Sequence, residues 1–500
     1  MKKFREITDT SRVKLNTDIS SSLERYRDSL GDEGYLALLN ELENPLPSAI
    51  RANLLKVAPE NAIQKWKLSY DWDLKPISYC PYGWQVISSG VSVSRTIEHR
   101  MGEYYVQDAA SMLPVTLLDN RSKDCQLILD MAASPGGKTT QLIDVTGDRS
   151  FVIANDTSAS RLQALRIVLQ TWGAMNYAIT NYPGEQMGSW FPEVFDVILL
   201  DAPCSMENFR PTISHPLRST TTGERDRLSQ RQSLLLQSVF RALKPGGQLI
   251  YATCSLAPEE DELVLDNLLK VFPGLVSIDK IQVKGIHAPG ITSFMGRNLD
   301  PSVANALRLW PHIAGTSGFF TARINKSGST CKDIVSPPIR DFSKTGLRPL
   351  ISSEVDLISS ILIDTFGFSI DEMCQKYNIG LFRRHETIYG LPLTYLDRFQ
   401  SLPFHTLGMR LGKLIIQDFQ PSHELLSRFG YNFSRGIIEL PDELVPLWMS
   451  GQDLRGFSPS HGHLKGPCLI KDRQSRIMGG GNIQTNRLRN LLPTHALLSS

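Results

Sequence analysis

Cysteines are few in this sequence, and no apolar run is long. Its 500 residues include seven cysteines, which are odd in number and scattered along the chain. That pattern argues against the disulfide framework of a secreted protein and against a Cys-x-x-Cys zinc site. No apolar stretch approaches the ~18 residues of a membrane helix, and no apolar signal-peptide core follows the charged start. We therefore expect a cytoplasmic protein that binds no metal and no membrane.

Neither positive nor negative charges are in large excess over the whole sequence. The 53 Lys and Arg residues nearly balance the 51 Asp and Glu residues, and the hydrophobic share of 41% is ordinary for a folded chain. At roughly 150 residues per domain, the length allows about three domains. Basic residues gather locally, because residues 461–500 contain six Lys or Arg and a single acid, Asp472. Such a tail suggests contacts with phosphates, although a solvated surface would have the same composition.

The middle of the chain has the pattern of an α/β domain. Four apolar runs that each meet a polar or turn residue are predicted to be buried parallel strands. They are residues 126–130, 151–155, 195–200 and 248–253. Alternation of these strands with helical stretches indicates right-handed βαβ units and a doubly wound sheet, which is expected to finish near residues 319–324.

The sequence pattern predicts two helices between these strands. Residues 162–172 carry large apolar side chains at spacings of three and four, which places them on one helix face. Thr157 or Ser158 could cap the start of this helix, and Gly173 could end it. A second helix is predicted at residues 228–243 and is expected to stop at the Lys-Pro-Gly-Gly segment that follows.

The flanking regions are less regular. Residues 1–95 are predicted to form short helices and loops, and residues 325–350, rich in Gly, Ser and Pro, a linker. Residues 351–430 are mixed, with one helix near 355–363. Residues 431–500 contain short β-like runs and are expected to form a small separate domain.

Polar and small residues that could bind a ligand follow the first two of these strands. Residues 130–140 read Asp-Met-Ala-Ala-Ser-Pro-Gly-Gly-Lys-Thr-Thr, which is neither Gly-x-Gly-x-x-Gly nor a P-loop. The small residues would let a ligand approach the backbone at a helix N-terminus, or they form a plain turn. Asp156 ends the next strand, where an acid can bind both hydroxyls of a ribose or simply begin a helix. Together the two features favour a nucleoside-bearing cofactor.

Thiols follow the other two strands. Asp201 is followed by Ala-Pro-Cys-Ser, and Cys254 lies in Thr-Cys-Ser. A lone cysteine is usually a small buried hydrophobe, but Cys204 and Cys254 both fall at strand ends where ligands bind. A thiol, an acid and a nucleoside cofactor together fit methylation at carbon 5 of a pyrimidine. There a thiolate adds to carbon 6 and makes carbon 5 nucleophilic, while a carboxyl stabilises the adduct.

The four motifs, in this order and spacing, resemble the Sun/Fmu-type RNA (cytosine-5) methyltransferases. The bacterial RsmF branch, which acts on small-subunit (16S) rRNA, is the most similar. The resemblance continues in Pro-Ser-Ala-Ile-Arg-Ala-Asn at 47–53, Tyr-Val-Gln-Asp-Ala-Ala-Ser at 105–111, Gly-Phe-Phe-Thr-Ala-Arg at 318–323 and Leu-Gly-Met-Arg-Leu-Gly at 407–412. It implies a Rossmann-like class I S-adenosylmethionine-dependent methyltransferase core, with an N-terminal α+β extension and a small C-terminal β-rich PUA-like domain.

The resemblance also implies residue roles. Cys254 resembles the nucleophile that adds to cytosine carbon 6, Cys204 the second cysteine that assists product release, and Asp201 the acid that faces both cofactor and base. Asp156 resembles the ribose-binding acid. The cofactor loop comprises Ala132, Ala133, Ser134, Pro135, Gly136, Gly137 and Lys138. Lys138 could also aid the site electrostatically, or it is a solvated loop lysine.

Some positions depart from the family pattern. Pro183 stands where the family usually has an acid near the adenine, and Asn181 could substitute for it. Met-Glu-Asn at 206–208 replaces Gly-x-Gly, which is expected to alter the loop that meets the target base. Residues 209–222 form a Ser/Thr/Pro-rich loop in place of the usual charged residues, so target choice could differ.

The resemblance implies four regions and an RNA partner. They are an RNA-binding extension (1–95), the catalytic domain (96–326), a linker and middle domain (327–430) and a PUA-like RNA-binding domain (431–500). Small-subunit rRNA or a 30S particle is the expected partner of a monomer. Candidate phosphate contacts in the tail are Arg473, Arg476, Arg487 and Arg489.

Alternatives stay open at this point. The same reaction could act on tRNA, and the departures at Pro183 and 206–208 would also fit an RNA-binding assembly factor that no longer methylates. An amino-group methyltransferase is disfavoured, because residues 201–204 do not read Asn/Asp-Pro-Pro-aromatic.

Overall fold

The computed structural model describes residues 23–119, 126–207, 220–330, 335–416, 418–457 and 465–498. Within them, the largest sheet has nine strands in the order β10-β14-β9-β8-β5-β6-β7-β18, with β13 paired to β14. Its antiparallel strands include β10 (Val276–Asp279), β13 (Leu307–Leu309) and β14 (Phe319–Lys326). Its parallel strands are β5 (Leu127–Asp130), β6 (Phe151–Asn155), β7 (Tyr177–Thr180), β8 (Phe195–Asp201) and β9 (Leu243–Thr253). The four predicted strands are confirmed, and β7 is an additional strand.

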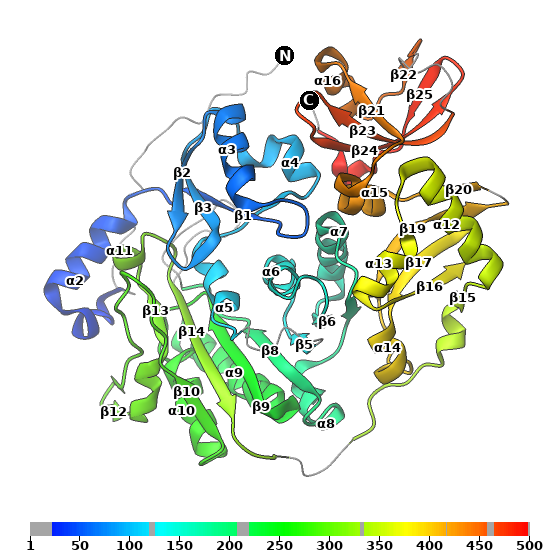
Figure 1. The fold of residues 1–500 in the computed structure, drawn as a ribbon. Helices are drawn as coiled ribbons and strands as arrows, with labels where there is room; N and C mark the ends of the chain where they lie inside the picture. The colour runs from blue at the N-terminus through cyan, green and yellow to red at the C-terminus, as the bar shows by residue number, and fades with distance from the viewer. Residues whose placement is uncertain are drawn as a thin grey trace.

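Helices cover both faces of this sheet (Figure 1). Helices α6 (Gly137–Val145) and α7 (Leu162–Trp172) lie on one face, and α9 (Thr222–Ala242) and α10 (Glu262–Val271) lie on the other. Ile128 packs in one cluster with Leu142 of α6, whereas its neighbour Leu129 packs in another with Leu236 of α9. Because successive side chains of a strand point to opposite faces, burial of both faces produces the continuous apolar runs of the sequence.

The strand order creates a crevice in the middle of the sheet. From β5 the chain winds outward through β6 and β7, and then returns to the other side of β5 to form β8 and β9. The direction of winding therefore reverses between β5 and β8. In open α/β sheets, ligands bind at the carboxyl ends of the strands at this reversal. Asp130 ends β5 and Asp201 ends β8.

The predicted helices are present, with different boundaries. Helix α7 ends at Gly173, which has a left-handed φ of 84°, as predicted. Ser158 makes no side-chain cap, because a 3-10 turn (Ala159–Arg161) precedes the helix. Helix α9 begins before residue 228, since the Thr221 hydroxyl caps it by accepting from the Glu224 amide at 3.2 Å. The Lys-Pro-Gly-Gly segment belongs to β9 rather than to a turn.

The N-terminal part contains a sheet that the sequence pattern did not predict. Strands β1 (Ser48–Ala52), β2 (Asp73–Ile77), β3 (Cys80–Ser88) and β4 (Tyr104–Val106) form a four-stranded sheet in the order β2-β3-β1-β4. The prediction of short helices and loops is wrong for this part. Its strands do not show a regular alternation of buried and exposed residues, so the period-2 signal is absent.

The C-terminal part contains two further five-stranded sheets (Figure 1). One has the order β15-β16-β17-β19-β20, and its strands are β15 (Arg348–Pro349), β16 (Ile379–Arg384), β17 (Thr387–Pro392), β19 (Met409–Ile415) and β20 (Asp418–Pro421). The other has the order β21-β23-β24-β25-β22, and its strands are β21 (Ile437–Leu440), β22 (Leu454–Arg455), β23 (Gly466–Asp472), β24 (Ile477–Gln484) and β25 (Arg487–Asn490). Helix α12 (Ser352–Phe366) confirms the helix expected near 355–363. The central sheet does not finish near residue 324, because β18 (Thr406–Leu407) pairs with the edge strand β7. Among the described residues, no helix has the length and apolarity to cross a membrane.

Candidate active site

Two thiols meet at the ends of neighbouring parallel strands. Cys204 follows β8 and Cys254 follows β9, and their Sγ atoms lie 3.0 Å apart. Both cysteines are free and partly exposed. The hydrogen bond with Cys254, together with burial, raises the pKa of Cys204 well above its ordinary value. Cys204 therefore stays a thiol at neutral pH, and its S–H can donate to the sulfur of Cys254.

One buried carboxylate holds the two cysteine loops together. Glu260 is fully buried and accepts from the Ser205 amide at 2.8 Å and from the Ser255 hydroxyl at 3.0 Å. Each serine directly follows one of the cysteines, so this side chain sets the distance between the thiols. Gln232 of α9 donates to the same carboxylate at 3.0 Å. The sequence interpretation missed Glu260, although four consecutive acids at 259–262, just after the second motif, were an available signal.

An ion pair lies beside the thiols. Lys138 Nζ is 2.7 Å from Asp201 Oδ2. Burial lowers the pKa of Lys138, but the negative charges of Asp201 and Cys254 outweigh it and leave that pKa above its ordinary value. Lys138 is thus a cation at neutral pH, and it is paired with Asp201 beside the thiols.

The loop between β5 and α6 packs closely against its neighbours. Gly136 has a φ of 115°, where a side chain would be strained. A Cβ atom at Gly137 would lie 3.0 Å from the Tyr105 ring. Asp130 is buried and accepts from the Thr139 hydroxyl at 2.6 Å, and burial raises the pKa of Asp130 to about 7.

A cavity of about 210 Å³ opens beside this loop. Its lining includes Asp130, Asp201 and all of residues 132–138 except Gly136. The opposite wall comes from β4 and the following turn, and includes Tyr105, Gln107, Asp108 and Ser111. The sequence interpretation assigned no site role to these wall residues, although an acid and a serine after a short strand were visible at 108–111. Cys204 and Cys254 lie outside this lining.

The end of β6 is tied to the same loop. Asp156 is buried, and its two carboxylate oxygens accept from the backbone amides of Ser134 at 3.1 Å and Ser158 at 2.8 Å. Asp156 therefore lies behind Ser134 rather than in the lining of the cavity. The Asn181 side-chain amide donates to the Asp156 carbonyl at 2.6 Å, so it contacts the backbone beside this acid. Pro183 begins a 3-10 turn at the next strand end.

The segment after Cys204 contains no glycine, yet one of its residues lies in the left-handed region of backbone conformation. Met206 has a φ of 61°, which costs an ordinary residue about 1–2 kcal/mol. Glu207 anchors the segment through an ion pair with Arg225 at 3.1 Å and a carbonyl that accepts from the Leu256 amide at 3.1 Å. The prediction that Met206 and Asn208 alter the loop that meets the target base stays a prediction. Asn208 and most of the 209–222 loop lie outside the described residues.

The arginines of the C-terminal tail are partly committed to carboxylates. Arg476 pairs with Asp472 at 2.6 Å, and Arg487 pairs with Asp453. These ion pairs reduce the positive charge that the tail can offer to a phosphate. A phosphate role of the tail stays a prediction.

Solved structures share the fold of the core. A methyltransferase homologue from Pyrococcus horikoshii superposes with a TM-score of 0.55 at 31% identity, over 62% of this chain and 100% of its own. NSun6 from the same organism, solved with SFG, has a TM-score of 0.53 at 20% identity, over 63% of this chain and 99% of its own, and supports the fold alone. The predicted Rossmann-like class I methyltransferase fold is confirmed, and the cofactor of this class is S-adenosylmethionine.

Two family models match the sequence. The model described as 16S rRNA methyltransferase RsmB/F matches residues 115–325, and that of the N-terminal domain of 16S rRNA methyltransferase RsmF matches residues 20–109. Ribosomal RNA small subunit methyltransferase F from Aeromonas hydrophila is 31% identical over 459 residues, 90% of each chain. The protein with that name from Vibrio parahaemolyticus is 29% identical over 462 residues, 91% of this chain and 92% of its own. The chain therefore belongs to the RsmB/F family of 16S rRNA methyltransferases.

Proposed function

We propose that this protein methylates carbon 5 of a cytosine in small-subunit (16S) rRNA through a covalent adduct between Cys254 and carbon 6 of the base. The observation that carries the proposal is the pair of thiols, 3.0 Å apart, at the ends of two parallel strands beside the Lys138–Asp201 ion pair. Methylation of an amino group or a ribose hydroxyl needs no thiol. A reaction at carbon 5 needs a nucleophile at carbon 6, which a thiolate provides.

The residues at the crevice fit S-adenosylmethionine. The cavity beside the 132–138 loop is lined by three carboxyl groups, those of Asp108, Asp130 and Asp201, and by a stretch of small residues that would let a ligand approach the backbone closely. Asp130 and Asp201 would accept from amino and hydroxyl groups there. Asp156 accepts from the Ser134 amide and would hold this loop in place for the ribose. Bound there, S-adenosylmethionine supplies the methyl group that becomes attached to carbon 5.

The two thiols take different roles in this proposal. Cys254 adds to carbon 6 as the thiolate, which the Lys138 cation stabilises. Cys204 carries its proton at neutral pH because its pKa is raised, so it is unsuited to be the nucleophile. Release transfers the carbon-5 proton to water as the bond between Cys254 and carbon 6 breaks, and the Cys204 S–H, 3.0 Å from the Cys254 sulfur, assists by donating to the departing thiolate. Asp201 hydrogen-bonds the N3 edge of the cytosine and so stabilises the adduct.

The proposal places the protein in the cytoplasm with RNA as its partner. A reducing compartment suits the chemistry, because two sulfurs at 3.0 Å must stay reduced for one of them to attack the base. The target base must leave its stack to reach Cys254, so a loop or a flipped nucleotide of the rRNA is the expected substrate.

Bisulfite sequencing of total RNA tests this function. Cells with the active protein are compared with cells that lack it, and 16S rRNA and tRNA are read in parallel. One 16S cytosine is expected to lose its protection from conversion when the protein is absent. Loss of protection in tRNA instead would move the activity to the alternative substrate. Unchanged protection in both, with no methyl transfer to RNA by the purified protein, would contradict methylation at carbon 5.

We expect that replacement of Glu260 displaces the thiols of Cys204 and Cys254. In the Glu260→Gln variant, one oxygen becomes an NH₂ group, which cannot accept from the Ser205 amide or the Ser255 hydroxyl. A lost hydrogen bond to a charged group costs about 1.5–3 kcal/mol, so kcat should fall roughly 10- to 100-fold through misplaced cysteines. The KM for S-adenosylmethionine should stay within about two-fold, because Glu260 does not line that cavity. Steady-state kinetics with both substrates measure the two effects. A fall in kcat that merely follows the loss of folded protein, seen in urea titrations, would contradict this positioning role.

A further inference from the structure

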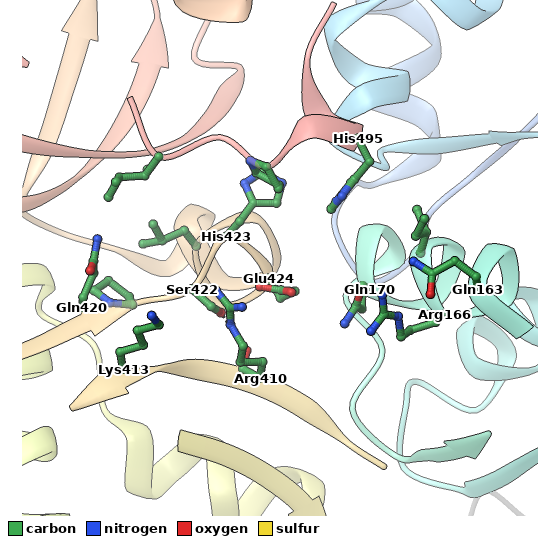
Figure 2. Close-up of a pocket in the computed structure, with 16 residues that line it drawn as sticks. Gln163, Arg166, Gln170, Arg410, Lys413, Gln420, Ser422, His423, Glu424 and His495 are labelled. Carbon is green, nitrogen blue, oxygen red and sulfur yellow. The ribbon is translucent and has the colours of Figure 1, made fainter. Parts of the chain in front are cut away.

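A second cavity lies where three parts of the chain meet (Figure 2). It measures about 470 Å³ and is lined from α7, β19 (Met409–Ile415), β20 (Asp418–Pro421), α15 (His423–Phe429) and the 3-10 turn Thr494–Ala496. On α7, Gln163, Arg166 and Gln170 recur at spacings of three and four, so they share a face that differs from the buried leucine face. The cavity thus depends on the packing of the methyltransferase core, the middle sheet and the C-terminal unit. It shares no lining residue with the cavity beside Asp201.

The cations of this cavity make no ion pair with a carboxylate of the described residues. Figure 2 shows the side chains of Arg166, Arg410 and Lys413 around it. In the part of the chain that the structure describes, none of the three makes an ion pair, unlike Arg476 and Arg487 in the tail. A single carboxylate, Glu424, belongs to the lining. Three cations against one acid, within one concavity, produce a positive potential that attracts an anion.

Three side-chain nitrogens beside the same cavity also lack a hydrogen-bond partner among the described residues. Arg166 Nε, His423 Nδ1 and His495 Nε2 are buried without a hydrogen-bond partner among the described residues. His423 is only 9% exposed, and its ring centroid lies 6.1 Å from that of His495. Burial, with the nearby charges of Lys56 and Arg410, lowers the pKa of His423 to about 3, so this ring is neutral at pH 7. Unpartnered buried polar atoms cost about 1–3 kcal/mol each, and a ligand with several acceptor oxygens would satisfy them.

We propose that this cavity binds a phosphate group of the RNA substrate, at a site separate from the thiols. Arg166, Arg410 and Lys413 contact the phosphate oxygens, and the two histidines hydrogen-bond the same nucleotide. The cavity volume lies within the range of about 300–1,000 Å³ that holds small ligands, so a phosphate with its adjoining nucleoside fits. This inference rests on the proposed function, because it assigns the anion to the RNA on which the enzyme acts.

The test removes the two exposed cations of the cavity in the full-length protein. For the Arg410→Gln/Lys413→Gln variant, we expect binding of a 16S rRNA fragment to weaken about 10-fold near 0.15 M salt. The slope of log K against log salt should fall by about 0.7–0.9, as expected when one phosphate is no longer neutralised. The KM for RNA should rise accordingly, with kcat at saturating RNA unchanged. Arg166→Gln, on a different element, should weaken binding in the same direction.

A charge-matched control separates this site from general attraction. Lys344→Gln/Lys376→Gln removes the same charge from exposed positions of the middle part that do not line the cavity, and it should weaken binding less than two-fold. Equal losses in the two double variants, or an unchanged salt slope in the first, would overturn the proposal. Competition with AMP and inorganic phosphate separates the sources of the anion. Tight binding of either at the cavity, with RNA affinity unaffected by the variants, would assign the site to a free metabolite instead.

Failure of this proposal is distinguishable from failure of the proposed function. RNA affinity and its salt slope are measured without methyl transfer, so they report on the cavity even if the methylated atom is not carbon 5. Normal RNA affinity in the variants, with bisulfite protection intact in the wild type, would remove the phosphate site and leave the activity in place.

Discussion

The Cys254→Ala variant is expected to lose methyl transfer to RNA by at least about 10³-fold, the scale seen when a covalent nucleophile is removed. Without the sulfur, carbon 6 gains no adduct and carbon 5 stays a poor nucleophile. The loss should be confined to the chemical step, because Cys254 lies outside the lining of the cofactor cavity. Transfer of a labelled methyl group from S-adenosylmethionine to 16S rRNA measures the rate, and equilibrium dialysis measures cofactor binding. Turnover within ten-fold of the wild type would contradict the role of Cys254.

Other cysteines provide the controls for this prediction. In the Cys204→Ala variant, Cys254 is still present and should still attack the base, but release should be slow. A protein–RNA adduct that survives denaturing electrophoresis is therefore expected to accumulate. Cys374→Ala changes a cysteine of α13 (Ile370–Tyr377), away from both strand ends, and should leave the rate unchanged. Adduct accumulation in Cys254→Ala rather than in Cys204→Ala would reverse the two roles.

The Arg51→Met variant is expected to show the largest loss of stability. Arg51 is fully buried and donates to Asp144 Oδ2 at 2.5 Å, to the Thr140 hydroxyl at 2.6 Å and to the Gly137 carbonyl at 3.0 Å. It thus joins β1 of the N-terminal sheet to α6 of the core. Removal of one partner leaves a buried charge uncompensated, which costs about 3–5 kcal/mol. Urea unfolding of the purified protein measures the change.

Two variants separate charge from packing in this prediction. Arg51→Met combined with Asp144→Leu removes both charges, and it should recover most of the lost stability, because an apolar pair of similar volume is often as stable as a buried ion pair. Arg323→Met breaks an ion pair with Asp279 that is partly exposed and should cost at most about 1 kcal/mol. A double variant as unstable as Arg51→Met would show that the loss comes from packing.

Local sequence patterns were sufficient for the core of the enzyme. The strands β5, β6, β8 and β9 were predictable because both of their faces are buried, and the runs are therefore apolar throughout. The positions of Asp130, Asp156, Asp201 and the cysteines at strand ends followed directly. Helix α7 was predictable from its leucine spacing, whereas the polar first turns of α9 hid its start.

Features that form where segments far apart in the sequence pack together were not predictable from local sequence patterns. The N-terminal strands lack an alternating pattern, and β18 has only two residues, so neither has a periodic signal. Glu260 is an ordinary acid in the sequence, and its contact with both cysteine loops depends on how α9 and the strand ends pack. The wall of the cavity beside the 132–138 loop at Tyr105 and Asp108 comes from β4 of another sheet and from the turn that follows it.

The sequence by itself determined which chemical groups stand at the ends of the central strands, because the carboxyl ends of parallel strands meet at one edge of a sheet. Tertiary structure alone decided that Cys204 and Cys254 touch, since this contact depends on the register of β8 against β9. The tertiary structure also decided which cationic side chains make an ion pair with a carboxylate. Among the described residues, the tail arginines Arg476 and Arg487 are paired with carboxylates, whereas Arg166, Arg410 and Lys413 line one cavity without an ion pair. Ion pairing depends on distances in space, which composition does not record.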